Sequence, residues 1–256
     1  MKRIRVIPVL LIKKGGLVKS VRFKNHKYVG DPINAVKIFN DKEVDELAIL
    51  DISATPEQKP PDMNMIAEIA GEAFMPLSYG GGISSVDQVR KILYSGIEKI
   101  VLNKSAHTRP ELIHEIAKSF GSQSVMVSID VKKNIFGRYK VFTDNGAQNT
   151  GLNPIEFAKQ CESRGAGEIL LNSIERDGTY NGYDLELVKS ISRSVNIPVV
   201  ACGGAGSLED FRAAVTEGNA SAVSAGSMFI FQRPHNAVLI SYPKQSELVE
   251  KVYQYL

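Results

Sequence analysis

Residues 126–133 read MVSIDVKK, and residues 7–14 read IPVLLIKK. The two stretches align without gaps at a spacing of 119 residues, and each contains the short apolar run that is typical of a buried strand. The second stretch has a carboxylate, Asp130, where the first has Leu11. The chain's own repeat therefore predicts an aspartate at position 11, and the leucine found there limits the proton-transfer chemistry that the protein can perform.

The repeat extends over the whole chain. Three further pairs of stretches match in the same order, at spacings of 121, 123 and 122 residues: 48–51 with 169–172, 77–82 with 200–205, and 101–105 with 223–227. A period of this length is too long for a solenoid repeat. We interpret the chain as two homologous halves, about 1–122 and 123–256.

Short apolar runs alternate with longer amphipathic segments. The runs are continuously apolar, as expected of parallel strands that are buried on both faces. We expect strands at 4–11, 47–52, 75–79, 98–103, 124–130, 167–172, 197–202 and 221–225, and helices near 32–43, 62–73, 85–95, 109–119, 154–164, 184–194, 207–217 and 245–254. Eight strand–helix units in two groups of four predict a single (β/α)8 TIM barrel over 1–256, with an open doubly wound sheet as the alternative. Segment 131–153 is predicted to be a long polar loop that can cover the mouth.

The composition excludes several classes of protein. The 256 residues include 31 basic and 28 acidic side chains, for a net charge of +3, and no basic block indicates nucleic-acid binding. No stretch reaches the ~18 apolar residues that span a bilayer, and residues 1–13 lack a signal-peptide cleavage site. Two cysteines suggest a reducing compartment, and the four histidines lack metal-ligand spacing. We expect a cytoplasmic protein that binds neither nucleic acid nor membrane and needs no metal or cofactor.

Two glycine turns follow the third and seventh predicted strands. Glycine lets backbone N–H groups approach an anion beside a helix N-terminus, and ligands of such barrels bind at the carboxyl ends of the strands. Two matched turns predict a ligand with a phosphate at each end; the alternative is that the glycines only make tight turns. The expected ligand-binding residues are Gly81, Gly82, Asn103, Asp177, Gly178, Gly203, Gly204, Gly226 and Ser227.

Longer stretches resemble the cyclase subunit of imidazole glycerol phosphate synthase over essentially the whole chain. They are 50–54 (LDISA), 80–83 (GGGI), 120–123 (FGSQ), 164–171 (RGAGEILL), 176–179 (RDGT) and 203–206 (GGAG). The sugar isomerase of the same pathway shares the double-phosphate barrel, but 164–171 and 176–179 look like the cyclase. Residues 9–13 and 242–243 look like a paralogous branch associated with surface-polysaccharide biosynthesis. In that branch a cyclase-like barrel and a glutaminase supply ammonia to a sugar amidotransferase, which builds an acetamidino group.

The resemblance implies a two-protein machine. A glutaminase docks on the amino-terminal face of the barrel, and its ammonia passes through the barrel to a phosphoribosyl substrate at the opposite mouth. Two aspartates, at the ends of the first and fifth strands, serve as general acid and base. Asp130 matches the second of them, and Leu11 replaces the first. Because a positioned carboxylate contributes roughly 10²–10⁴-fold to the rate, we expect a subunit without full cyclase activity on its own.

Three further positions follow from the same resemblance. Lys104 stands where the family usually has threonine, and it adds a long cation to the first anion site. Lys19 matches a position near the substrate mouth; its alternative is a solvated loop lysine. Asp51 is expected either to hold a ligand hydroxyl or to orient a loop.

Four charged residues lie near the starts of predicted strands, and all four match the family's ring of salt bridges at the ammonia entrance. They are Arg5, Glu46, Lys99 and Glu168. A dry conduit would keep ammonia from protonation in bulk water. The alternative is that these ion pairs only close the bottom of the barrel for stability.

Three functions remain open at this point. The first is a cyclase-like subunit that accepts ammonia in a glutamine-dependent amidation of a surface-polysaccharide sugar. The second is an ordinary cyclase of histidine biosynthesis, in which another group replaces the missing acid. The third is a phosphosugar-binding or isomerase barrel without any role for ammonia, since the fold alone cannot choose among these functions.

Overall fold

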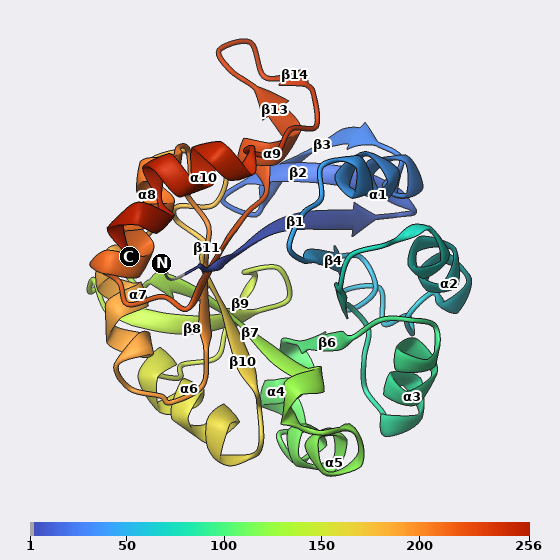
Figure 1. Ribbon diagram of the computed structural model, residues 1–256. Helices are drawn as coiled ribbons and strands as arrows, with labels where there is room; N and C mark the ends of the chain where they lie inside the picture. Colours follow the sequence, from blue (N-terminus) through green and yellow to red (C-terminus); the bar gives the residue numbers. More distant parts are fainter. Residues whose placement is uncertain (1–2) are drawn as a thin grey trace.

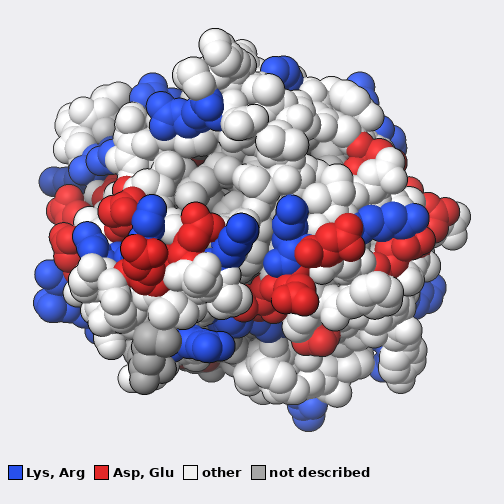
Figure 2. All heavy atoms as spheres, turned by 45° about the horizontal axis from the view of Figure 1, so that its top comes forward, with Lys and Arg blue, Asp and Glu red and all other residues white. Residues whose placement is uncertain are grey.

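A computed structural model describes residues 3–256 of the protein (Figure 1). Positions 1 and 2, where the predicted barrel and the basic N-terminal pattern begin, lie outside the described residues. None of the helices within residues 3–256 has the length and apolar character needed to cross a membrane. Basic and acidic side chains are interspersed on the face that Figure 2 presents.

Eight parallel strands form a closed ring, which confirms the (β/α)8 barrel and excludes the open sheet. Each strand of the ring pairs with the next, and the circle closes where β7 pairs with β10 and β12 pairs with β1. The barrel strands are β1 (Arg5–Lys13), β4 (Leu47–Asp51), β5 (Leu77–Gly80), β6 (Lys99–Leu102), β7 (Val125–Lys133), β10 (Glu168–Ser173), β11 (Val199–Cys202) and β12 (Ala222–Ala225). The division of this ring into two homologous halves stays a prediction.

Eight longer helices surround the strands (Figure 1). They are α1 (Pro32–Asp41), α2 (Met63–Glu72), α3 (Val86–Tyr94), α5 (Glu111–Phe120), α6 (Pro154–Ser163), α7 (Leu185–Ser192), α8 (Leu208–Thr216) and α10 (Gln245–Lys251), and all lie on predicted helices. Most begin at a side chain that accepts a hydrogen bond from the first helical turn, as Asp31, Ser85 and Ser207 do. Such caps satisfy backbone donors that the helix itself leaves free.

The core has two layers because the barrel strands are buried on both faces. In β1, Leu10 and Ile12 belong to the large cluster between strands and helices, whereas Val9 belongs to a smaller cluster inside the barrel. Leu11 packs against the edge of that inner cluster. Alternate residues of one strand thus face opposite layers, which explains the continuous apolar runs in the sequence.

Two antiparallel hairpins stand on the carboxyl-terminal side of the barrel. β1 continues into β2 (Gly16–Val21) and β3 (Lys24–Gly30), and β7 continues into β8 (Tyr139–Thr143) and β9 (Gln148–Asn149). The prediction of a loop over 131–153 is wrong at 131–133, 139–143 and 148–149, because β7 extends further and pairs with β8, which in turn pairs with β9. The β2–β3 turn has positive φ at Arg22 and Phe23 and contains no glycine, so its sequence signal is weak, whereas the β8–β9 turn contains the run 144–146 (DNG), which is typical of a turn.

Several short elements complete the chain. Helices α4 (Lys104–Thr108) and α9 (Ser227–Ile230) follow β6 and β12 directly. A third hairpin, β13 (Phe231–Gln232) with β14 (Ala237–Val238), projects away from the ring of helices (Figure 1). Two single 3₁₀ turns lie at Ser122–Ser124 and Tyr253–Tyr255.

Candidate active site

A cavity of about 510 Å³ opens at the carboxyl ends of the barrel strands. It brings together every ligand-binding and catalytic position expected from the sequence, although these positions come from all parts of the chain. Those lining residues are Leu11, Lys19, Asp51, Gly81, Gly82, Asn103, Lys104, Asp130, Asp177, Gly178, Gly203, Gly204, Gly226 and Ser227. The arrangement agrees with the rule that barrel ligands bind at this end.

Asp130 lies near the end of β7 and is the most strongly perturbed acid of the cavity. Asn103 Nδ2 donates to its Oδ2 at 3.1 Å, and Ser128 Oγ donates to its Oδ1 at 3.5 Å. Burial, and then the charge of Asp177, raises the pKa of Asp130 to about 7, against the opposing effect of the two hydrogen bonds. A carboxyl with this pKa can both give and accept a proton near neutral pH.

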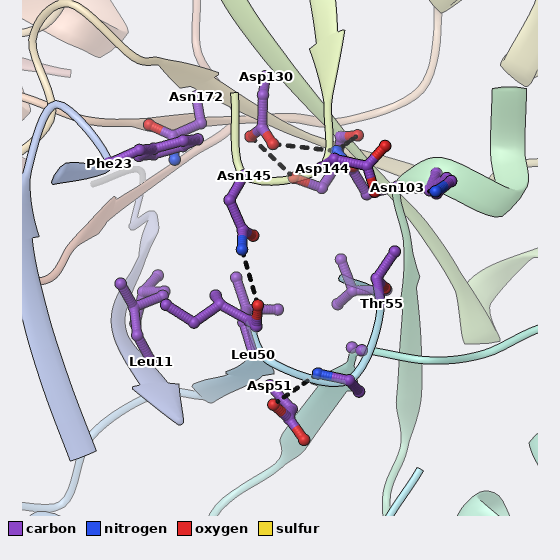
Figure 3. Close-up of a pocket in the computed structure, with 18 of the residues that line it drawn as sticks. Leu11, Phe23, Leu50, Asp51, Thr55, Asn103, Asp130, Asp144, Asn145 and Asn172 are labelled. Carbon is purple, nitrogen blue, oxygen red and sulfur yellow. Dashed lines mark hydrogen bonds and ion pairs between the residues drawn. The ribbon is translucent and has the colours of Figure 1, made fainter. Parts of the chain in front are cut away.

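Leu11 faces the cavity from β1, on the opposite side from Asp130 (Figure 3). Its Cα partner is Leu50 on β4, and both side chains pack against the inner apolar cluster. The first barrel strand therefore presents hydrocarbon at the place where the fifth, β7, presents a carboxyl group.

Asp51 does not replace the missing carboxylate. Its Cα partner is Ile12, which faces the helices, so Asp51 lies on the other side of the strands from Leu11 and Leu50. Its Oδ1 accepts hydrogen bonds from Ser53 N at 2.8 Å and Ser53 Oγ at 2.7 Å. Figure 3 shows this side chain turned away from the middle of the cavity. These bonds favour the expectation that Asp51 orients a loop.

The first glycine turn, at the end of β5, packs too tightly for any side chain. A Cβ on Gly81, whose φ is +127°, would collide with the backbone carbonyl of Asp51. Asn103, which also lines the cavity, precedes α4 and donates to Asp130 through the hydrogen bond already described. Lys104, the next residue, forms an ion pair with Asp144 at 2.9 Å. We call the glycine turn after β5, with Asn103 and Lys104, the first anion half-site, and the turn after β11, with Gly226 and Ser227, the second. The first half-site therefore contains a cation that already has a partner within the protein.

Gly226, which directly follows β12 and so lies next to the strand that carries the second glycine turn, has a buried lysine beside it. A Cβ on Gly226 would collide with Lys19 Nζ, which itself donates to the carbonyl oxygen of Val9. Burial lowers the pKa of Lys19 to about 8, although the charge of Asp177 opposes that shift. Burial also raises the pKa of Asp177, against the effect of Lys19 and of Ser20, whose Oγ donates to Asp177 Oδ2 at 3.3 Å. Both half-sites thus contain a lysine, and the solvated-loop alternative for Lys19 is wrong because that side chain is buried.

Several cavity residues were not predicted as part of the site, and four of them bear on its geometry. Phe23 comes from the β2–β3 turn, and Asp144 and Asn145 come from the β8–β9 turn, where Asn145 Nδ2 donates to the carbonyl oxygen of Ile52 at 2.7 Å. No local pattern in these two segments indicates that their turns reach the cavity. Asn172, at the end of β10, did have a signal, because the internal repeat aligns it with Asp51.

The four predicted floor residues form one closed network at the opposite end of the barrel. Arg5 bonds to Glu46 at 2.6 Å and also to Glu168, while Lys99 Nζ lies 2.9 Å from both carboxylates. Burial opposes the charge of Arg5, but its bonds to Glu168 and Glu46 outweigh that effect and raise its pKa. The structure therefore joins these residues across the barrel axis, and their role as an ammonia gate stays a prediction.

Other reactive groups in the described part of the chain lack the surroundings for chemistry. Burial raises the pKa of the Cys202 thiol to about 12, and that of Cys161 also to about 12, so both cysteines are poor nucleophiles at neutral pH. Within residues 3–256 there is no group of three or more His, Cys, Asp or Glu side chains placed to hold a metal ion.

Comparison with known proteins agrees with this geometry. The sequence profile described as "Histidine biosynthesis protein" matches residues 5–234. A protein of Pseudomonas aeruginosa, provisionally described as imidazole glycerol phosphate synthase subunit hisF2, is 51% identical over 248 residues, which are 97% of this chain and 99% of that protein. A provisionally described subunit HisF of Leptospira interrogans is 48% identical over 244 residues, or 95% of this chain and 96% of the relative.

A third relative is described without reservation. The imidazole glycerol phosphate synthase subunit HisF of Alkaliphilus metalliredigens is 44% identical over 242 residues, which are 94% of each chain. The resemblance stated from the sequence motifs is therefore confirmed over nearly the full length of the protein. The chain belongs to the histidine biosynthesis protein family, as a HisF-like (β/α)8 barrel.

Proposed function

We propose that this barrel accepts ammonia from a glutaminase partner and supports the amidation of a surface-polysaccharide sugar, in which an acetamidino group is formed. In this proposal the chain lacks the full cyclase activity, because Leu11 stands where the family's first catalytic aspartate is expected. The observation that carries the proposal is the asymmetry of the cavity: Asp130 faces an apolar wall made by Leu11 and Leu50.

The chemistry of that wall supports the loss of cyclase activity. A ring-closing reaction of this family needs both a general acid and a general base. At the matched positions of β1 and β7, this chain provides only one carboxyl group, that of Asp130. Asp130 retains a suitable pKa of about 7, but a leucine side chain can neither donate nor accept a proton. The turned-away carboxylate of Asp51 does not fill this role.

The two ends of the barrel support a conduit for ammonia. The floor network closes the amino-terminal end with paired charges. Above it the barrel interior is mainly apolar, with Val9, Ala48 and Val200 among its lining residues and the small side chains of Ser78 and Ser224 between them. An apolar path would keep a small neutral amine away from water until it reaches the mouth.

The amino-terminal face of the barrel, where the floor network lies, offers a surface for the glutaminase. Phe74 follows α2 and Tyr94 ends α3, so both lie on the amino-terminal side of the barrel, and they are 90% and 81% exposed. Large exposed aromatic side chains are enriched at protein interfaces. We place the glutaminase on this face, in the cytoplasm, with a sugar amidotransferase as the consumer of the ammonia-derived group and a phosphorylated small molecule in the cavity.

The test is a cyclase assay with the purified chain, its glutaminase partner and the substrate of the histidine pathway. We expect no turnover with either glutamine or added ammonium salt, and measurable turnover after Leu11→Asp. Leu11→Asn serves as the matched control, because asparagine is polar and similar in size to aspartate but does not ionise and so cannot act as a general acid or base. Robust turnover by the unchanged protein would end the proposal.

One observation favours a second candidate, an ordinary cyclase of histidine biosynthesis. Asp177 lies close enough to Asp130 for its charge to raise the pKa of Asp130, and both side chains are buried. Asp177 would then supply the second carboxyl group in place of the residue at position 11. Growth of a strain that lacks its own cyclase, restored by this gene and abolished by Asp177→Asn, would establish that function instead.

A further inference from the structure

Asn172 is a cavity residue whose side-chain oxygen lacks a partner in the described part of the chain. Its Oδ1 atom is buried and has no hydrogen-bond partner among residues 3–256. Buried polar atoms in native proteins nearly always have a partner, and an exception at a binding site often marks a group that a ligand completes. The amide of Asn172 therefore needs an explanation that the fold itself does not provide.

The neighbours of Asn172 place it at the reactive side of the cavity. Its Cα partners are Asp130 on β7 and Cys202 on β11, and all three residues line the cavity. Because register partners of parallel strands point to the same face, these side chains form one wall. Figure 3 shows Asn172 and Asp130 on the same side of the cavity, away from Leu11.

The second glycine turn makes room for this amide. A Cβ on Gly203 would lie 2.5 Å from Asn172 Oδ1 and 2.8 Å from the carbonyl oxygen of Ser173. A glycine at 203 is thus required for the amide to occupy its place. Asn172 consequently sits between the acid of Asp130 and the anion half-site that Gly203 helps to build.

The opposite wall is apolar, since it consists of Leu11 and Leu50. A ligand held at both ends by the two glycine turns would have its middle between these walls. Any hydroxyl or amine on that middle segment loses water on binding, and the leucines offer it no hydrogen bond. The unpartnered amide of Asn172 does.

We propose that Asn172 is a ligand-positioning residue that determines specificity, by hydrogen bonding to an O–H or N–H group in the middle of a ligand with two anionic ends. The proposal rests on the proposed function only for the two anionic ends. A side-chain amide offers both an acceptor and a donor, so one hydroxyl can satisfy it in either direction. A site that hydrogen-bonds a ligand hydroxyl discriminates strongly against an analogue that lacks it, because the protein group is then left unpaired.

The test compares two bisphosphates of equal chain length. Ribulose 1,5-bisphosphate has hydroxyls in its middle segment, and pentane-1,5-diyl bisphosphate has none. We expect Asn172→Leu to weaken binding of the first about ten-fold and to leave binding of the second within about two-fold, as measured by titration calorimetry. Asn34→Leu, at an exposed position of α1, is the control for the substitution itself.

Each result decides the matter. An equal loss for both bisphosphates, or no loss for either, overturns the proposal. Asn172→Ser keeps a hydrogen-bonding group and should recover part of the preference for ribulose 1,5-bisphosphate, which shows that a weak Asn172→Leu variant is not merely misfolded.

A second measurement separates this proposal from the anion half-sites. If the unchanged protein binds neither bisphosphate, the prediction that the two half-sites bind phosphate is wrong. A crystal structure of the protein then decides the role of Asn172. An ordered water or solute atom within hydrogen-bond distance of the amide supports the proposal. An amide rotated onto a protein partner overturns it.

Discussion

Lys104 Nζ and Asp144 Oδ1 lie 2.9 Å apart and join α4 to the turn between β8 and β9. The neighbouring Asn145 donates to the carbonyl oxygen of Ile52, just after β4. The β8–β9 turn therefore has two contacts with the rest of the mouth, one at Lys104 and one at Ile52. An internal carboxylate thus neutralises the cation of the first anion half-site. An incoming phosphate must compete with Asp144 for Lys104.

Asp144→Asn should therefore strengthen phosphate binding. Lys104 is 39% exposed and the Asp144 side chain 18%, and pairs of this kind contribute up to about 1 kcal/mol, which corresponds to roughly five-fold in affinity. We expect inorganic phosphate to bind about three- to five-fold more tightly at low ionic strength, with little change in the free energy of unfolding. Glu186→Gln, which removes the loose 3.9 Å pair with Lys133, should leave phosphate binding unchanged. Weaker binding by Asp144→Asn would contradict the competition.

Asp130 should make stability depend on pH. Its pKa is about 7 in the folded protein and 3.8 as an unperturbed side chain, so the unfolded chain releases this proton first as the pH rises. The contribution of Asp130 to the free energy of unfolding is fully present below about pH 4. It is lost as the pH rises from there through 7, and the loss is at most about 4 kcal/mol. Asp130→Asn lacks this loss, and its free energy of unfolding relative to the unchanged protein should increase between pH 4 and pH 8.

Urea denaturation at several pH values measures this difference. The control is Asp87→Asn, because the Asp87 side chain is 81% exposed on α3. If the difference in unfolding free energy between Asp130→Asn and the unchanged protein stays constant from pH 4 to pH 8, the prediction that Asp130 has a raised pKa in the folded protein is wrong.

Lys99→Met should damage both stability and coupling to the glutaminase. Lys99 bonds to Glu46 and Glu168, whose side chains are only 3% and 7% exposed, so its loss leaves buried carboxylates with one cation instead of two. Removing one partner of such a network costs about 3 kcal/mol in the free energy of unfolding. We also expect the barrel's stimulation of its glutaminase partner to fall, while phosphate affinity at the far mouth is retained.

The control for Lys99 is Lys37→Met, since Lys37 pairs with Glu72 on the surface. Unchanged stimulation of the glutaminase by the Lys99 and Arg5 variants would favour a phosphosugar-binding barrel without any role for ammonia.

Gly203→Ala should destabilise the protein more than Gly137→Ala. Both glycines have positive φ, +87° and +73°, so both substitutions strain the backbone by about 1 kcal/mol. A Cβ at 137 meets no atom within 4 Å, whereas a Cβ at 203 collides with Asn172 and Ser173. We expect the difference in unfolding free energy to be about 1–3 kcal/mol, the usual cost of forcing atoms into a packed site. Equal effects of the two substitutions in thermal or urea denaturation would show that the turn at 203 is loosely packed.

Local pattern predicted most of the fold. The eight barrel strands and eight longer helices lie on the predicted segments, because burial on both faces makes a strand continuously apolar and burial on one face gives a helix its period. The cavity positions at Gly81, Asn103, Gly203 and Asp130 were also found from the sequence, since they lie at strand ends and strand ends of a barrel meet at one mouth.

Tertiary structure decided which polar groups in the mouth are free and which are occupied. Asp144 reaches Lys104, and Asp51 turns towards Ser53, through contacts that no local pattern encodes. The same is true of Asn172, whose isolation depends on the space left by Gly203. By itself the sequence determined the barrel, its charged floor residues and the leucine at position 11. Only the packing of distant hairpins and strands fixed the hydrogen bonds around that leucine, because such bonds depend on distances between residues far apart in the chain.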